Sequence, residues 1–362
     1  MRTYTHLCAA ALLASCVLAP MPAYACTIVK ADAFAAFWRG PDAPKPRHPL
    51  WSQILFDGQL LRPDTQACET SPLQVLTREL TTVAKDGGII LLGEVHDNGE
   101  HHKVRAEIIR QVSAALAKDE GEIKRVPLVF EHIRTDQQTG LDQFQAFNAE
   151  ARRLGTPSDL FRFLSWEKSG WPDQKIFTPL FEAAIAAKAP IIAGDPSKTA
   201  IRAVARSGLG SLDSDTLKTL RLDESLAPPL QDALLAELVD GHCGLMPKDK
   251  LAPMASAQRY HDAHLASATL AAAAEFGTAI VLTGNGHVRA DRGVPLYLSQ
   301  MVPDKLVVTV VFVETTDGRI DPNSYAPKAP DGKAAANYVV FTPRVARADP
   351  CDAMRAAMQK KG

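Results

Sequence analysis

Residues 89–98 read IILLGEVHDN, and this stretch decides the fold because it joins a buried strand to a polar turn. Four consecutive aliphatic residues followed by glycine are typical of a strand in a parallel sheet that is covered on both faces. Asp97 or Asn98 can cap the helix that follows. On this helix, apolar residues recur every four positions and predict one face that packs on the sheet: Val104, Ile108, Val112 and Leu116.

Further short apolar runs follow the same pattern along the chain. They lie at residues 128–130, 190–193, 279–282 and 306–313, and stretches with helical periodicity separate them. Alternating strands and helices predict βαβ units. We therefore expect an α/β fold with a mainly parallel central sheet, flanked by helices on both faces.

The rest of the chain is organised around this sheet. We expect an additional strand near residues 53–56, a helix at 72–84, a long Ala-rich helix at 253–276 and an edge strand near 338–341. The predicted segments are a signal peptide at 1–25, an N-terminal extension at 26–85, the α/β domain at 86–316 with a mostly helical insertion at 199–254 that is a candidate lid, and a C-terminal tail at 317–362.

The N-terminus has the layout of a secretory signal peptide. A basic start precedes an apolar run at residues 7–19, and the small-residue site AYA follows at 23–25. We expect the mature chain to begin at Cys26 and to be periplasmic. The alternative is a lipid anchor in the outer membrane, because LASC at 13–16 also fits a lipoprotein signal. No later segment has the length of uninterrupted apolar sequence that a membrane span needs.

The cysteines that remain after this cleavage are Cys26, Cys68, Cys243 and Cys351. An even number in an oxidising compartment predicts up to two disulfides, and the sequence leaves three pairings open. A bond between Cys26 and Cys351 would tie the two termini together.

Charge and motif content argue against several classes of protein. The 40 basic and 41 acidic residues nearly cancel, so nucleic acid is not an expected partner. The sequence has no His-Glu-x-x-His, Cys-x-x-Cys or Cys-x-x-Cys-His. No P-loop, Gly-x-Ser-x-Gly or Gly-x-Gly-x-x-Gly follows a predicted strand. Serine hydrolases, nucleotide hydrolases, dinucleotide enzymes and covalent c-type haem proteins therefore lack their usual support.

Polar residues stand at the ends of the predicted strands. Because ligands bind outside the carboxyl ends of parallel strands, we expect these residues to line one crevice. Gly93, Gly284 and Gly286 permit the tight turns that bring the side chains to a ligand. The polar residues in question are Glu94, His96, Asp97, Glu131, His132, Asp195, Asn285 and His287.

Glu94, His96, Glu131 and His287 are the candidates for catalysis and for holding a divalent metal. Two imidazoles and two carboxylates can bind such an ion and leave a position open for water. The alternative is structural: the two histidines hydrogen-bond loop carbonyls and Glu94 caps a helix.

Other histidines leave two interpretations open. His101 and His102 begin a helix, where the local field disfavours imidazolium; each is either a neutral ligand or a buried residue bonded to a carboxylate. His261 and His264 are spaced to share a ligand, although a core or surface position is the expectation for them.

Several stretches, in order along residues 48–314, resemble the ChaN-like haem-binding uptake family of the Tiki superfamily. They include LGEVHDN (92–98), HH (101–102), FTPLFEAA (177–184), DGHCG (240–244) and GNGHVR (284–289). The chain differs from the usual family pattern at Gly99, His261 and Leu265.

The resemblance implies an exported protein that binds haem without covalent links and takes part in haem or iron acquisition. It also implies outer-membrane uptake machinery and a homodimer as partners. The candidate haem-binding residues are His101, His102, His242, Asn285 and Tyr297. No motif fixes the axial ligand of the iron, for which Tyr297 and Tyr260 are the candidates. The superfamily contains proteins regarded as metal-dependent hydrolases, so hydrolysis at the Glu/His cluster is the alternative function, and whether the protein is an enzyme stays open.

Overall fold

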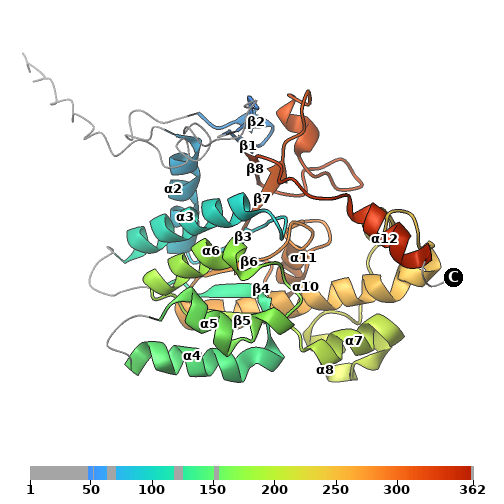
Figure 1. Ribbon diagram of the computed structural model, residues 1–362, viewed down its shortest axis with the longest axis horizontal. Coiled ribbons are helices and arrows are strands. Elements are labelled where there is room, and N and C mark those ends of the chain that lie inside the picture. The colour runs from blue at the N-terminus through green and yellow to red at the C-terminus, as the bar shows by residue number, and fades with distance from the viewer. Residues whose placement is uncertain (1–47, 52, 63–70, 118–124, 151–154, 360–362) are drawn as a thin grey trace, which may run out of the picture.

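The computed structural model describes residues 48–51, 53–62, 71–117, 125–150 and 155–359 (Figure 1). In this part of the chain, one sheet contains β1 (Ile54–Phe56), β2 (Gln59–Leu60), β3 (Ile89–Leu92), β4 (Leu128–Arg134), β5 (Ile191–Asp195), β6 (Ala279–Leu282), β7 (Val307–Glu314) and β8 (Tyr338–Thr342). The order across the sheet is β2-β1-β8-β7-β3-β6-β4-β5. All neighbours from β8 to β5 are parallel, whereas β1 pairs antiparallel with both β2 and β8. The predicted mainly parallel sheet is confirmed.

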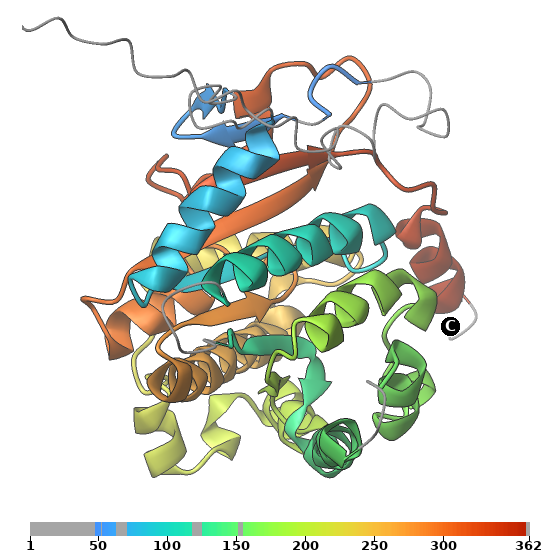
Figure 2. The same ribbon diagram turned by 90° about the vertical axis from the view of Figure 1, so that its left-hand side faces the viewer.

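Helices cover both faces of the sheet (Figures 1 and 2). One face carries α2 (Pro72–Lys85), α3 (Gly99–Leu116), α4 (Gln138–Glu150), α5 (Pro157–Phe163) and α6 (Gln174–Ala186). The other carries α7 (Lys198–Ser207), α8 (Ser214–Thr219), α10 (Lys248–Phe276) and α11 (Val294–Met301). The remaining α-helices are α9 (Pro228–Gly241), which packs on α10, and α12 (Pro350–Gln359). Short 3-10 helices lie at Thr135–Gln137, Trp166–Lys168, Leu209–Ser211 and Pro322–Tyr325.

The residues of β3 alternate between two hydrophobic cores. Ile90 and Leu92 belong to the core under α3 and α6, and Ile89 and Leu91 to the core under α10 and α11. All four side chains are fully buried. Because neither face of β3 meets water, its four residues are all apolar, and the polar groups of this segment begin in the turn that follows it.

Two strands differ from their predictions. The strand near 338–341 exists as β8, but it is not an edge strand, because β1 and β7 pair with its two sides. Glu131 and His132 lie within β4 rather than after it, since β4 continues to Arg134 with a shift of register against β5. These two polar residues are therefore held by the sheet itself.

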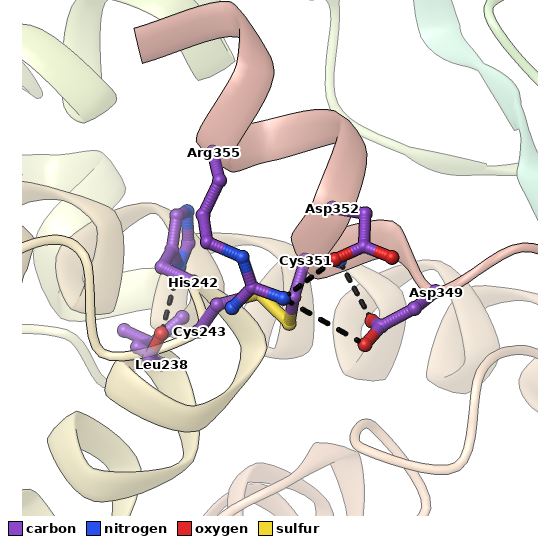
Figure 3. Close-up of a disulfide and its surroundings, with 7 residues drawn as sticks. All are labelled: Leu238, His242, Cys243, Asp349, Cys351, Asp352 and Arg355. Atoms are coloured by element: carbon purple, nitrogen blue, oxygen red, sulfur yellow. Dashed lines mark hydrogen bonds and ion pairs between the residues drawn. A yellow bond between two sulfur atoms is a disulfide. The ribbon is translucent and has the colours of Figure 1, made fainter. Parts of the chain in front are cut away.

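Cys243 and Cys351 form a disulfide that joins the end of α9 to α12 (Figure 3). Their Cα atoms are 5.6 Å apart and the two residues are separated by 108 positions in the sequence. This bond excludes the pairing of Cys26 with Cys351. Cys26, Cys68 and the predicted signal peptide lie outside the described residues. Within those residues, no helix has the length and apolar character required to cross a bilayer.

Candidate functional site

Two turns meet at the carboxyl edge of the sheet because the parallel strands β3 and β6 end side by side. The turn after β3 carries Glu94 and His96, and the turn after β6 carries Asn285 and His287. The backbone N–H of Asn285 donates to the Glu94 carbonyl at 2.9 Å. His96 and His287, almost two hundred residues apart in the sequence, consequently line the same pocket.

Glycine is required at two positions where the turns touch. A Cβ on Gly284 would lie 2.8 Å from Cε1 of His96, and a Cβ on Gly93 would overlap the side-chain oxygen of Asn285. Neither glycine has a left-handed φ. The role of these glycines is therefore close approach between the two turns rather than an unusual backbone conformation.

Glu94 is the centre of the first cluster and its side chain is fully buried. Its Oε1 accepts hydrogen bonds from His96 Nδ1 at 2.7 Å and from His132 Nε2 at 2.8 Å. Its Oε2 pairs with Arg105 and lies 3.1 Å from His102 Nδ1. Because a carboxylate only accepts, the nitrogens of His96 and His132 that face it carry protons.

Burial controls protonation around Glu94. Desolvation lowers the pKa of His102 to about 3 and holds the pKa of His132 well below its ordinary value. Burial also lowers the pKa of the Arg105 guanidinium to about 9, which leaves it charged at neutral pH. Arg105 thus supplies the compensating positive charge for Glu94, and His132 supplies a neutral N–H group, whereas Nε2 of the neutral His102 donates to the His96 carbonyl at 3.1 Å.

His287 is the centre of a second cluster. Its Nδ1 lies 2.7 Å from Asp262 Oδ1, and its Nε2 lies 3.4 Å from Glu131 Oε1. Burial alone would lower the pKa of His287, but Glu131 and Asp262 raise it well above its ordinary value. Burial raises the pKa of Asp262 to about 6. Glu131 also accepts from Thr283 Oγ1 at 2.6 Å and from Gly284 N at 2.7 Å. Burial would raise the pKa of Glu131, but His287, His96 and His132 together hold it well below the usual range.

A pocket of about 610 Å³ opens beside both clusters. Leu234, Glu237 and Leu238 of helix α9 line the pocket together with the two turns that carry the histidines. The side chain of His96 is 40% exposed, whereas that of His287 is 9% exposed. A ligand entering the pocket therefore meets His96 first.

His96 has the geometry expected of an iron or metal ligand. Its Nδ1 is fixed by Glu94, and no partner contacts its Nε2 among the residues that the structure describes. Metal-binding histidines usually donate their other ring N–H to a carboxylate in this way. The ligand atoms of Glu94, His96 and His132 also lie within 4.8 Å of one another, so these three residues fit a divalent metal.

Three of the predicted haem-binding residues, His101, His102 and Asn285, already have polar atoms engaged, and the buried His102 donates to the His96 carbonyl as described above. His101 is fully buried; its Nδ1 accepts from Val95 N at 2.9 Å, and its Nε2 lies 2.7 Å from Thr342 Oγ1. The amide of Asn285 donates to the Phe312 carbonyl at 2.7 Å and accepts from Phe312 N at 3.1 Å. The side chains of His101 and Asn285 hold the turns on the sheet.

The other predicted residues lie around the pocket rather than in it. Tyr297 is buried, its hydroxyl accepts from Arg259 Nε at 3.0 Å, and burial raises its pKa to about 12. Tyr260 is also buried. His242 lies beside the disulfide, where its Nδ1 donates to the Leu238 carbonyl at 2.7 Å (Figure 3).

The histidines of α10 belong to a neighbouring network. His261 Nδ1 bonds to Asp195 at the end of β5, and its ring centre lies 6.1 Å from that of His287. His264 Nδ1 donates to the Gly194 carbonyl at 2.9 Å. These contacts hold α10 against the end of β5. They also place His261 next to the cluster around His287.

Sequence reasoning did not identify Arg105 and Asp262 as parts of the site. A signal for Arg105 was present, because it lies on α3 next to Val104 and Ala106, which are both buried. A charged residue among buried positions of a helix must have a buried partner of opposite charge. Asp262 gave only the weaker signal of a carboxylate next to histidine.

The protein is thus of the α/β class, with a mainly parallel sheet and two carboxylate–histidine clusters at the carboxyl ends of its strands. The family described as haem-binding uptake, Tiki superfamily, ChaN matches residues 80–298. The chain belongs to this family.

Solved structures match this chain to different extents. ChaN of Campylobacter jejuni, described with cofacial haem binding, matches with a TM-score of 0.57 and 18% identity over 79% of this chain and 95% of that chain. The type III effector HopBA1 matches with a TM-score of 0.39 and 13% identity over 73% and 92%. A succinoglycan biosynthesis protein matches with a TM-score of 0.30 and 15% identity over 66% and 69%. No curated protein matches the sequence.

Proposed function

We propose that this protein binds haem without covalent links and serves haem or iron acquisition. Membership of a haem-binding uptake family supports the general role. The observation that carries the proposal is the state of His96, a partly exposed imidazole whose Nδ1 is held by Glu94 and whose Nε2 is directed away from that bond. Haem iron accepts a histidine nitrogen of this kind as an axial ligand.

The residues of the pocket fit the remaining parts of a haem. Leu234 and Leu238 offer apolar contacts, and Arg292 would offer a guanidinium to a carboxylate of the porphyrin by exchanging its ion pairs with Glu237 and Asp291. When bound, haem supplies an iron centre for transport. His101, His102, Asn285 and Tyr297 would have to give up hydrogen bonds to reach it.

Titration of the purified protein with hemin tests this proposal. We expect a saturable Soret band, and His96→Ala should weaken hemin binding about tenfold or more through loss of the iron ligand. His242→Ala is the matched control, because His242 is also partly exposed but lies at the disulfide. If His96→Ala keeps its affinity for hemin and His242→Ala loses it, the iron is not bound at His96.

We propose further that the protein is exported to the periplasm, works with outer-membrane uptake machinery and forms a homodimer when haem is bound. The signal-like residues 7–25 support export. Mass spectrometry of the mature N-terminus should find Cys26 as the first residue, and a lipid on Cys16 would establish the anchored alternative. Light scattering with and without hemin measures the oligomeric state.

A second candidate function is metal-dependent hydrolysis, favoured by the close approach of Glu94, His96 and His132. A divalent metal bound there would supply an activated water, and Glu131 and His287 lie next to it as acid–base groups. Elemental analysis after zinc loading should find one ion that His132→Ala loses. Because both functions use His96, zinc should reduce hemin binding; independent saturation by both ligands would contradict a shared site.

A further inference from the structure

Arg347 attaches the C-terminal segment to the turn that carries His96. Its guanidinium binds Asp97 through Nε at 2.7 Å and Nη2 at 2.8 Å, and it binds Glu314 through Nη1 and Nη2, both at 2.7 Å. Asp97 directly follows His96, and Glu314 ends β7. Two-pronged pairs of this kind fix orientation as well as distance. The position of the His96 turn therefore depends on a residue outside the family match, which ends at residue 298.

Neighbouring contacts strengthen this attachment. The side-chain amide of Asn98 donates to the Pro343 carbonyl at 3.1 Å and to Glu314 Oε1 at 2.8 Å. Val345 N donates to the same Glu314 oxygen at 3.2 Å. Asn98 also caps α3. The segment 343–347 is thus hydrogen-bonded to the start of α3 and to the end of β7.

Four residues further on, Cys351 is bonded to Cys243 at the end of α9 (Figure 3). Helix α9 lines the pocket, yet Leu234 is its only buried residue, and the apolar cluster beneath it is small. Burial of so few side chains gives a helix little stability of its own. The disulfide is consequently a large part of what holds α9 in place, and both of its cysteines are partly exposed to solvent.

We propose that residues 343–351 form a strap beside the pocket, fastened by Arg347 to the His96 turn and by the Cys243–Cys351 disulfide to α9, and that reduction of this disulfide frees α9 and opens the pocket. The reductant is a dithiol. It supplies two electrons and two protons, the S–S bond breaks to give two cysteine thiols, and the dithiol becomes a disulfide. A ligand bound against α9 then dissociates faster.

Hydrogen exchange measured by mass spectrometry on the full chain tests the strap without any ligand. In the Cys243→Ser/Cys351→Ser variant, the amides of α9 should exchange about tenfold or more faster than in the oxidised protein, because the covalent restraint on local opening is lost. The amides of α6 serve as an internal reference and should not change. Dithiothreitol should accelerate hydrogen exchange of the α9 amides in the unmodified protein, so the test does not depend on folding of the serine variant. If the variant folds, dithiothreitol should not accelerate exchange in it any further.

Arg347→Gln tests the other fastening point. It should accelerate exchange in the segment 95–100 and leave α6 unchanged. Arg355→Gln is the matched control, because Arg355 lies on α12 beside the disulfide and pairs with Asp352 and Asp349 only at the surface. Equal behaviour of the two variants would overturn the role of Arg347.

The effect of the strap on a ligand rests on the proposed haem-binding function. Measuring hemin dissociation beside hydrogen exchange tests the two proposals separately. Faster exchange in α9 together with faster hemin release after reduction supports both. Faster exchange with unchanged hemin release keeps the strap and places haem outside this pocket. Unchanged exchange in α9 after reduction overturns the strap, whatever hemin does.

Discussion

The two clusters at the carboxyl edge of the sheet use the same residue types and reach opposite charge states. Around Glu94, one carboxylate is compensated by Arg105, and the buried histidines stay neutral. Around His287, two carboxylates make the histidine the cation, and within the described part of the chain no arginine pairs with either of them. A Gly-x-x-His turn follows a strand in each case.

This difference shows that the turn motif places a histidine but does not determine its chemistry. Burial keeps His102 and His132 neutral, whereas the carboxylates of Glu131 and Asp262 overcome the same effect of burial at His287. The difference also separates the roles: His96 keeps a free nitrogen for a ligand, whereas His287 is held between Asp262 and Glu131 and anchors the second turn.

The largest expected effect comes from removing the arginine that distinguishes the clusters. Arg105→Met leaves Glu94 as a buried, uncompensated charge and should lower the free energy of unfolding by about 3–5 kcal/mol. Urea unfolding measures this loss. Arg110→Met on the same helix removes only an exposed pair with Glu107, and should cost less than about 1 kcal/mol. Similar losses in the two variants would contradict the role of Arg105.

Next in size is the contact between the turns. Gly284→Ala introduces a Cβ that would lie 2.8 Å from His96, and should lower the free energy of unfolding by about 1–3 kcal/mol while weakening hemin binding. Gly286→Ala is the control, since the nearest atom to its Cβ is 3.6 Å away. If both variants behave like the unmodified protein, the two turns are not packed as described.

The charge states predict opposite responses to pH. The pKa of His102 falls from 6.5 to about 3 on folding, so the unfolded chain takes up a proton first, and stability should be lost as pH falls from about 6.5 towards 3. His287, whose pKa is raised, should lose its contribution as pH rises above 6.5 through the folded value. Each group contributes a slope of up to about 1.4 kcal/mol per pH unit.

Imidazole NMR resonances measured over pH identify which ring titrates. His102 should stay neutral in mildly acidic solution in which His287 stays protonated. A neutral His287 at pH 7 would remove the difference between the two clusters.

The smallest effect concerns the support of Glu131. Thr283→Val removes a hydroxyl that donates to Glu131 at 2.6 Å, and should lower the free energy of unfolding by about 1 kcal/mol, because Gly284 N still donates to the same oxygen. Thr82→Val, which removes only an exposed bond to the Arg78 carbonyl of α2, is the control. Thermal unfolding of both variants makes the comparison.

The strands and the meeting of the turns were predictable, because long apolar runs such as 89–92 report burial on both faces and parallel strands bring their ends together. The extent of β4 was not, since Glu131 and His132 give no strand signal of their own. The roles of Arg105 and of the Cys243–Cys351 bond depend on contacts between distant segments, and spacing in the sequence carries no record of those distances.

The most direct test of the central claim is the position of iron in crystals of the hemin-loaded protein, located by anomalous scattering. We expect an iron peak within bonding distance of His96 Nε2, between the His96 turn and α9. An iron peak at any other residue, with the His96 ring still free, would contradict it.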